Sequence, residues 1–371
     1  MKIGIDGHTL GSQSSGNENY CLKLLRDLAG AKANGERYVV YFTHLSGLAK
    51  IPITDQFKVK RIFPANPFIR IPLSFPFECR REKLDVFHAQ YIISPFCNCR
   101  TVTTIHDILF ESHPQFYTRF ENLYFRALIP GSARRADHII TVSQFSKTDI
   151  VFRYQVDPDK VTVVEQDPQD EFRLMDSDEC KEMILKKYGI VAPFVVYVGR
   201  VNARKNLVRL VEAFSRLYRK GIRHKLVIVG KQDWMAEQVV QKVKEMSLED
   251  EVVFTGYVDR DDVPVFYNAA EMLVFPSICE GFGLPVMEAM ACGVPVVTSY
   301  GSSLEEAAGG AAILVDPFSV ESIADAVEKV IAHPQLAISL REKGLKRVAD
   351  FRSARKPQQT VSIYRKVCGR N

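Results

Sequence analysis

The chain has 371 residues, enough for two domains, since a globular domain usually has roughly 100–200 residues. Its 46% hydrophobic and 25% charged residues are typical of a folded globular protein. No apolar run reaches the roughly 18 residues of a membrane-spanning helix, and Asp6 interrupts any signal-peptide core, so we expect neither feature. The net charge of +5 is mild; it agrees with an anionic small-molecule partner, and we expect no nucleic-acid partner.

Eight cysteines are scattered along the chain. Only Cys97 and Cys99 lie close together, and a C-x-C pair without nearby histidines is a poor metal site. We interpret the cysteines as reduced thiols, several of them small core residues, and therefore expect a cytoplasmic protein.

The first half of the chain alternates expected strands with expected helices. Apolar runs predict strands at 2–5, 38–43, 57–62, 85–88, 101–105, 138–142 and 161–164. Helices are predicted at 20–29, at 117–135 and from Ser143, which is a suitable N-cap. Gly16 and Asn17 stand before the first helix, where free backbone amides would accept an anionic group. The alternative is an ordinary flexible loop.

The strand at 101–105 ends in His106 and Asp107. Ligands of open α/β sheets bind beyond the carboxyl ends of the strands, which is where this pair falls. A purely structural histidine is the alternative reading.

The second half repeats the alternation. Strands are predicted at 194–198, 225–229, 252–255, 272–275 and 294–298, with a helix at 207–218. Strand–helix alternation at this spacing indicates parallel sheets with right-handed crossovers. The last 50 residues are predicted to be helical, with breaks at Pro334 and Pro357.

Arg200 and Lys205 lie in the loop GRVNARKN after the strand at 194–198. Arginine offers a planar fork for phosphate oxygens and lysine a point charge, so both suit a departing diphosphate. We expect the neighbouring Arg204 to be solvated.

The stretch 276–297, PSICEGFGLPVMEAMACGVPVV, reads as a strand end, a loop, a short helix and the next strand. Gly283 allows a tight turn and Gly293 suits the helix C-terminus. Free amides at the helix start form a site for hydroxyls or phosphates, bracketed by Glu280 and by Glu288, which we expect in the first helical turn. Alternatively, Glu288 only complements the helix dipole and the glycines only serve the turn. Glu280, however, has no packing reason to stand in an apolar, glycine-rich loop.

EGFGLPVMEAMACGVPVV and GRVNARKN resemble the two signatures of the retaining GT-B glycosyltransferases of family four. The segments TIHDILFESHPQFY and SARRADHIITVSQFS (132–146) resemble the bacterial mannosyltransferases of that family. The resemblance implies an α/β fold of two facing Rossmann-like domains with parallel sheets. The N-terminal acceptor-side domain is expected at 1–168 together with a returning helix at 355–371, and the C-terminal nucleotide-sugar domain at 169–354.

Two positions depart from the family pattern. Ser15 stands where the family often has the first of two glycines, and 165–168 read Glu-Gln-Asp-Pro in place of Pro-Asn-Gly or Pro-Glu-Gly. At these positions the resemblance does not carry over the backbone contacts of the usual glycines.

The resemblance also implies a role for each candidate site residue. The residues implied at the transferred sugar as catalytic groups are Glu280, His106 and Asp107. Those implied at the donor diphosphate are Arg200, Lys205 and Gly16. Those implied at the donor sugar and ribose are Glu288, Phe282, Gly283 and Leu284, with Tyr257 and Val258 at the base.

The reaction implied is transfer of a sugar from a nucleoside diphosphate to an acceptor hydroxyl with retention of configuration. GDP-mannose is the first expectation for the donor, with UDP-sugars as the alternative. The expected acceptor is a lipid-linked saccharide or an oligosaccharide in cell-surface polysaccharide synthesis, such as that of lipopolysaccharide. Because fixed cations are present and no Asp-x-Asp pair stands at a suitable loop, we expect no metal and no other cofactor. The competing hypotheses are a sugar-nucleotide 2-epimerase of the same fold and a non-catalytic sugar-nucleotide-binding scaffold.

Two stretches combine aromatic side chains with arginines, at 63–83 and at 116–135. Aromatic rings and cations together are what an interfacial segment at an anionic membrane needs. We therefore expect peripheral attachment to the inner face of the cytoplasmic membrane. The alternative is that the aromatics pack in the core, and the prolines of the first stretch are expected to prevent a clean helical face there.

Overall fold

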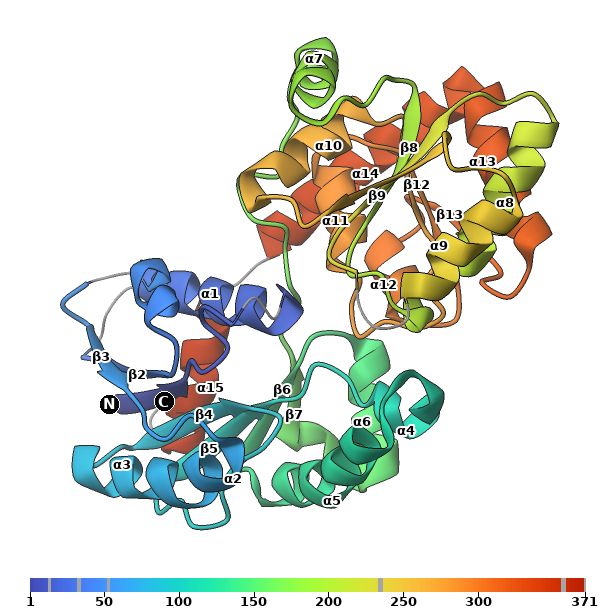
Figure 1. The fold of residues 1–371 in the computed structure, drawn as a ribbon. Helices are drawn as coiled ribbons and strands as arrows, with labels where there is room; N and C mark the ends of the chain where they lie inside the picture. Colours follow the sequence, from blue (N-terminus) through green and yellow to red (C-terminus); the bar gives the residue numbers. More distant parts are fainter. Residues whose placement is uncertain (13–14, 32–34, 52–53, 233–235, 355–357, 370–371) are drawn as a thin grey trace. The chain divides into compact units, whose positions relative to one another are not determined.

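The computed structural model describes residues 1–371 except 13–14, 32–34, 52–53, 233–235, 355–357 and 370–371. The chain divides into two compact units: unit 1 is Met1–Gln166 with Arg355–Asn371, and unit 2 is Asp167–Ala354. Each unit is an α/β sandwich around its own parallel sheet (Figure 1). The expected α/β fold with two Rossmann-like domains is therefore confirmed.

Unit 1 has a seven-stranded sheet in the order β3-β2-β1-β4-β5-β6-β7, and every adjacent pair is parallel. The strands are β1 (Lys2–Asp6), β2 (Arg37–Phe42), β3 (Phe57–Arg61), β4 (Val86–Gln90), β5 (Arg100–Thr104), β6 (His138–Thr141) and β7 (Val161–Val163). Its helices are α1 (Ser15–Gly30), α2 (Pro67–Ile69), α3 (Phe75–Glu82), α4 (Leu109–Ser112), α5 (Arg119–Arg135), α6 (Gln144–Tyr154) and α15 (Gln359–Val367).

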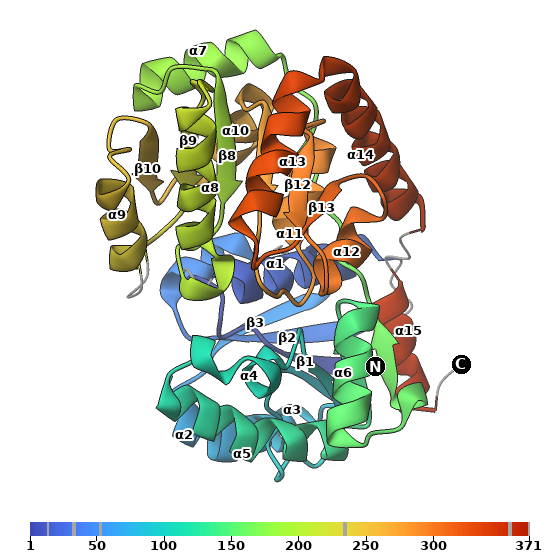
Figure 2. The same ribbon diagram turned by 90° about the vertical axis from the view of Figure 1, so that its right-hand side faces the viewer.

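Alternate side chains of these strands enter two core clusters, because successive residues of a strand point to opposite faces. One cluster joins the sheet to α1 and α15, for example through Leu25 and Tyr364. The other joins it to α3, α5 and α6, for example through Phe75, Ile129 and Ile150. The C-terminal helix thus completes the core of unit 1 (Figure 2).

Unit 2 has a six-stranded parallel sheet in the order β10-β9-β8-β11-β12-β13. The strands are β8 (Phe194–Val198), β9 (Lys225–Val229), β10 (Val252–Gly256), β11 (Met272–Phe275), β12 (Val296–Ser299) and β13 (Ile313–Val315). Its helices are α7 (Ser177–Tyr188), α8 (Leu207–Arg219), α9 (Ala236–Glu245), α10 (Val263–Ala269), α11 (Leu284–Ala291), α12 (Ser303–Ala308), α13 (Val320–Ala332) and α14 (Pro334–Ala354). α8 packs against α9 and α13, while α10 packs against α7 and α11 against α14 (Figure 1).

In both sheets the chain first adds strands on one side of the starting strand and then continues on the other side. This switch falls between β1 and β4 in unit 1 and between β8 and β11 in unit 2. Loops that leave such neighbouring strands diverge and open a crevice at the carboxyl edge, which is where ligands of this architecture bind.

One prediction about a helix is wrong: α1 begins at Ser15 rather than at residue 20, so Gly16 lies in its first turn and not in a loop. No helix was predicted for the proline-rich stretch, which forms α2, a π-helical segment at Arg70–Ser74 and α3 in succession. Pro67 and Pro76 stand in the first turns, where a missing N–H removes no bond, and the wider π turn accommodates Pro72.

The predicted break at Pro334 is confirmed, since α14 begins there, whereas Pro357 lies outside the described residues. Strand β13 was not predicted. Its three residues are apolar and end the run AAILV at 311–315, but only one of them is buried.

Within the described part of the chain, no helix combines the length and the apolar character that crossing a membrane requires.

Candidate active site

The switch point of unit 2 brings together the loops that follow β8 and β11. Ile278 N donates to Arg204 O at 2.9 Å. Asn206 Nδ2 donates to Pro276 O at 3.0 Å and to Pro317 O at 2.6 Å. These bonds hold the Arg200–Lys205 loop beside the loop that carries Glu280.

Glu280 lies between two cations. Its Oε1 is 2.6 Å from Lys205 Nζ, and its Oε2 is 2.7 Å from Nη1 of Arg204, which also donates to Cys279 O at 2.8 Å. Burial alone would raise the pKa of Glu280, but Arg204 and Lys205 outweigh burial and lower this pKa to about 2. The carboxyl group is therefore ionised at neutral pH, and the three side chains together carry a net positive charge.

Lys205 is also buried, and its Nζ lies 4.6 Å from the centroid of the Phe275 ring. Burial, assisted by Arg204, lowers the pKa of Lys205, and Glu280 opposes this effect. The expectation that Arg204 would be solvated is wrong. Residues Ala203–Lys205 form a single 3-10 turn, and this turn directs Arg204 and Lys205 toward the same carboxylate.

Arg200 lies in the same loop, directly after Gly199, and its side chain is exposed. Gly199 and Gly230 both adopt positive φ, and a Cβ on Gly230 would lie 2.1 Å from Gly199 O. Only glycine at position 230 allows these two backbones to approach so closely at the end of β8.

Helix α11 begins directly after Gly283, whose φ is 109° and whose added Cβ would lie 2.7 Å from Leu304 Cδ2. At its other end, Gly293 N donates to Met290 O and Val294 N to Ala289 O, both at 3.0 Å. These two bonds form a Schellman motif and confirm the predicted helix end at Gly293. Gly283 at the start of α11 and the Schellman motif at its C-terminus fix both ends of this short helix.

Glu288 lies in the second turn of α11, not in the first as predicted, because the helix begins at Leu284. It is therefore too far from the helix N-terminus for the dipole to explain its presence. Glu288 is buried, and its Oε2 accepts a hydrogen bond from Tyr267 OH at 3.4 Å. Burial raises the pKa of Glu288 to about 7, although Arg260 and Tyr267 oppose this effect.

The other residues of unit 2 that are candidates for binding the nucleotide sugar differ in exposure. Phe282 is buried, and its ring centroid lies 6.0 Å from that of Phe351. Leu284 is half-buried, Tyr257 is 66% exposed and Val258 is buried just after β10. Of these residues, Tyr257 is the one that presents a ring to solvent at the carboxyl edge.

In unit 1, the loops after β1, β4 and β5 meet at the carboxyl edge of the sheet. Nε2 of Gln90 lies 3.4 Å from both Thr9 Oγ1 and Asn17 O, which leaves Gln90 Oε1 to accept from His106 Nε2 at 3.0 Å. His106 therefore carries its proton on Nε2 and presents Nδ1 as an acceptor. Burial lowers the pKa of His106 to about 4, so the ring is neutral at pH 7.

Gln90 was not recognised from the sequence. The available signal was its position at the end of a buried strand that pairs with the strand before His106. Asp107 has a local partner: its Oδ1 accepts from Leu109 N at 3.2 Å, at the start of α4. Gly16 is exposed in the first turn of α1, and in the same turn Glu18 accepts from Gly11 N at 2.8 Å.

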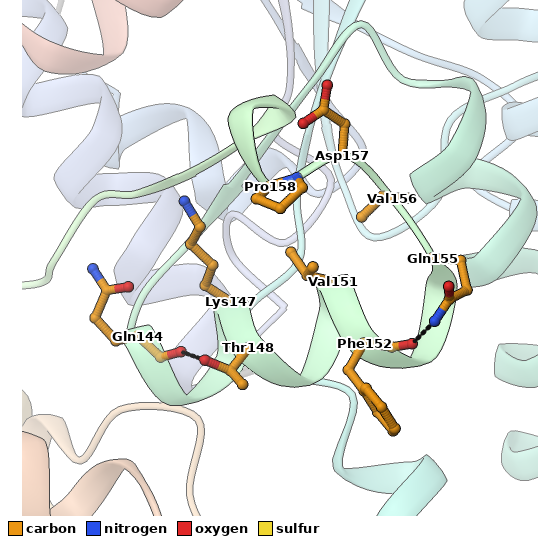
Figure 3. Close-up of a pocket in the computed structure, with 9 residues that line it drawn as sticks. All are labelled: Gln144, Lys147, Thr148, Val151, Phe152, Gln155, Val156, Asp157 and Pro158. Atoms are coloured by element: carbon orange, nitrogen blue, oxygen red, sulfur yellow. Dashed lines mark hydrogen bonds between the residues drawn. The ribbon is translucent and has the colours of Figure 1, made fainter.

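A cavity of about 620 Å³ lies along α6 and the turn at Pro158–Lys160. Figure 3 shows its lining residues, in which Thr148 donates to Gln144 O and Gln155 donates to Phe152 O. No candidate site residue lines this cavity, so we do not assign it to the active site. Among the described residues, no three His, Cys, Asp or Glu side chains form a cluster able to hold a metal ion, and metal independence stays a prediction.

Two parallel-sheet units with polar side chains at their switch points have the two-domain α/β architecture of the GT-B class. The family model of Glycosyltransferase Family 4 matches residues 14–166, and that of Glycosyl transferases group 1 matches residues 182–347. The chain belongs to the GT-B glycosyltransferases of the family-four type.

Relatives of known name agree with this class. The chain is 29% identical over 282 residues to O-antigen chain mannosyltransferase B of Escherichia coli, covering 76% of this chain and 74% of that protein. It is 28% identical to the serotype-specific mannosyltransferase WbdA of Escherichia coli over 68% of this chain, and spans about a third, 32%, of that longer protein. Sucrose-phosphate synthase from Thermosynechococcus elongatus has the same fold, with a TM-score of 0.78, 22% identity and 99% of each chain covered.

Proposed function

We propose that this glycosyltransferase is a retaining, metal-independent mannosyltransferase. It transfers mannose from GDP-mannose, or a sugar from a UDP-sugar in the alternative, to a hydroxyl of a lipid-linked saccharide or an oligosaccharide. The observation that carries the proposal is the ionised Glu280 between Arg204 and Lys205 at the switch point of unit 2.

Glycosyl transfer passes through a state in which the sugar is cationic and the departing diphosphate anionic. A carboxylate fixed among cations suits both charges. We propose that Glu280 stabilises the cationic sugar, and that Lys205 and Arg200 stabilise the anionic diphosphate. Ion pairs with Lys205 and Arg204 already hold Glu280, so the proposed reaction needs little reorganisation of this carboxylate. Fixed cations can take the part that a bound metal ion plays elsewhere, which is the reason for proposing metal independence.

Other residues supply orientation. Glu288, buried beside Tyr267, is proposed to accept from the ribose hydroxyls of the donor, and Tyr257 to lie against the base. The neutral His106, held by Gln90, is proposed to accept a hydrogen bond from a hydroxyl of the transferred sugar through Nδ1.

Mannose and a polysaccharide acceptor are proposed from the names of the two Escherichia coli relatives, which are both mannosyltransferases. A membrane-bound acceptor is further supported by exposed apolar residues on α2, the π-helical segment, α3 and α5 of unit 1. We call them together the α2–α5 patch: Phe68, Leu73, Phe77, Phe120 and Leu123. The rings of Phe68 and Tyr124 lie 5.5 Å apart, so α2 contacts α5. Arg80 and Arg81 of α3 and Arg119 of α5 are also exposed, which suits an anionic membrane surface.

The test has three steps. Thermal unfolding with GDP-mannose, UDP-glucose, GDP and UDP identifies the donor, because a bound nucleotide sugar stabilises the protein by mass action. Transfer of labelled mannose to acceptor extract, with and without EDTA, then tests activity and metal independence, and NMR of the product gives the anomeric configuration. Inversion, or activity abolished by EDTA, would refute the mechanism. Epimerisation at the sugar C2 would indicate the epimerase, and binding without turnover the scaffold.

A further inference from the structure

A line of buried side chains crosses the core of unit 1 from helix α15 to the ring of His106. Tyr364 OH lies 2.6 Å from His88 Nδ1, and His88 Nε2 lies 2.7 Å from Thr104 Oγ1. Tyr20 OH lies 2.6 Å from the same Thr104 oxygen. The ring of Tyr20 meets that of His106 edge to face, with centroids 4.6 Å apart.

The first four members come from four elements, α15, β4, β5 and α1, and all are buried. Tyr364 and Thr104 are 0% exposed, and the most exposed member, Tyr20, reaches only 6%. Polar groups in such surroundings cost free energy unless they are paired, and here each is paired with the next. Apolar side chains would fill the same space without needing hydrogen-bond partners. We therefore interpret this line of hydrogen bonds as fixing the orientation of its side chains.

His88 determines how its two neighbours are oriented. Burial lowers the pKa of His88 to about 3, so the ring is neutral at pH 7. A neutral imidazole has one donor and one acceptor nitrogen, and the hydroxyls of Tyr364 and Thr104 must therefore play opposite roles toward it. Removal of the Tyr364 hydroxyl leaves one buried nitrogen of His88 without its partner, and the ring, Thr104 and Tyr20 must then rearrange.

The His106 ring is held by the Gln90 hydrogen bond, by the ring of Tyr91 and by the ring of Tyr20. The Tyr20 contact depends on the line of hydrogen bonds, and Thr104 lies only two residues before His106 on the chain. We propose that Tyr364, His88, Thr104 and Tyr20 are positioning residues that hold the ring of His106 in its productive orientation. The kinetic consequence rests on the proposed transferase function, whereas the structural consequence does not.

The first test compares Tyr364→Phe with Tyr38→Phe. Tyr38 is a buried tyrosine of the same core cluster that stands outside the line, so the chemical change is matched. Proteins labelled with 15N-histidine give signals from the eight histidines, and the His106→Gln variant identifies that of His106. Tyr364→Phe should move the ring signals of His88 and His106, and Tyr38→Phe should leave the His106 signal in place. An unmoved His106 signal in a folded Tyr364→Phe protein overturns the proposal.

The second test is kinetic. Tyr364→Phe should lower kcat for mannosyl transfer by about tenfold, since small misplacements of a reacting group reduce rates strongly. The Kd for GDP, which has no transferred sugar to contact His106, should stay the same, because Arg200, Lys205 and Glu288, which we propose to bind the nucleotide, belong to unit 2. In a His106→Ala background, Tyr364→Phe should cause no further loss. An equal loss in both backgrounds overturns the positioning role. If the wild-type protein transfers no sugar, the proposed function fails, while the histidine spectra still decide the structural claim.

A pair of variants at Thr104 covers the case in which Tyr364→Phe does not fold. Thr104→Val removes the hydroxyl at nearly constant shape, and Thr104→Ser keeps it. The Val variant should shift the His106 signal and the Ser variant should restore it. Identical spectra from the two variants would contradict the proposal.

Discussion

Glu280 Oε1 accepts a hydrogen bond from Lys205 Nζ at 2.6 Å, although the two residues are 75 positions apart in the chain. The contact joins the loops after β8 and β11, the neighbouring strands at which the strand order of unit 2 reverses. It therefore places a buried charge pair where this type of fold binds its ligands.

Replacement of Glu280 by glutamine should abolish most turnover and spare donor binding. Glutamine keeps the shape of the side chain and removes the negative charge, which the proposed reaction needs only as the sugar becomes cationic. We expect kcat to fall by about 100-fold or more, with the Kd for GDP within a few-fold of wild type. Glu328→Gln is the matched control, since Glu328 forms a surface pair with Lys220. A near-normal transfer rate in Glu280→Gln would show that the assignment is wrong.

Variants that remove the cations should weaken nucleotide binding, in contrast to Glu280→Gln. Lys205→Ala and Arg200→Ala each remove a positive charge from the proposed diphosphate site, so GDP binding should weaken by about 10- to 100-fold. Calorimetric titration with GDP measures this effect, and Lys220→Ala serves as the control because Lys220 pairs with Glu328 on the surface. Binding of GDP at wild-type strength by both variants would mean that the loop does not contact the diphosphate.

Glu288 should make the stability of the protein depend on pH. Its pKa is raised from 4.5 to about 7 in the folded protein, so the folded state holds a proton that the unfolded state releases between these values. Stability should therefore fall as pH rises from about 4.5 to 7, by about 3 kcal/mol if no other group intervenes. Glu288→Gln cannot ionise and should lose this dependence.

Urea unfolding of both proteins at pH 5 and pH 8 measures the difference. At pH 8 the free energy of unfolding of Glu288→Gln should rise relative to that of the wild type, compared with pH 5. A difference in unfolding free energy that stays the same at both pH values would show that Glu288 ionises normally. Glu280 acts with the opposite sign, because its pKa is lowered to about 2, and it stabilises the protein above pH 4.5 and loses this effect in acid.

Strand positions and their alternation with helices were predictable because buried parallel strands are continuous apolar runs. β9 and β11 match the prediction at both ends. β13 was missed although 311–315 form an apolar run, since a run this short is not distinguished from a buried helix segment by periodicity. The helical character of 67–82 was missed for a different reason, since prolines in first turns and in a π turn do not break a helix.

The candidate site was predictable in its loops but not in its contacts. The sequence places Glu280 and Lys205 in loops that follow strands, and the sheet order then decides that those strands are neighbours. Arg204 and Lys205 are adjacent in sequence, and nothing in that pair indicates that both face the same carboxylate. Gln90 and the line from Tyr364 to Tyr20 depend on strand pairing and on the return of α15, which local patterns do not specify.

The last prediction concerns the α2–α5 patch. In the two stretches that motivate it, Phe75 and Arg70 are buried, whereas Phe68, Leu73, Phe77 and Phe120 are exposed. In flotation experiments the protein should bind vesicles that contain anionic lipid, and binding should fall as salt rises, because cations near the surface contribute to it. Leu73→Ser with Phe77→Ser should abolish binding, while Phe152→Ser, at an equally exposed phenylalanine on α6, should not. Equal binding to neutral and anionic vesicles, or no binding at low salt, would contradict the prediction and favour an acceptor in solution.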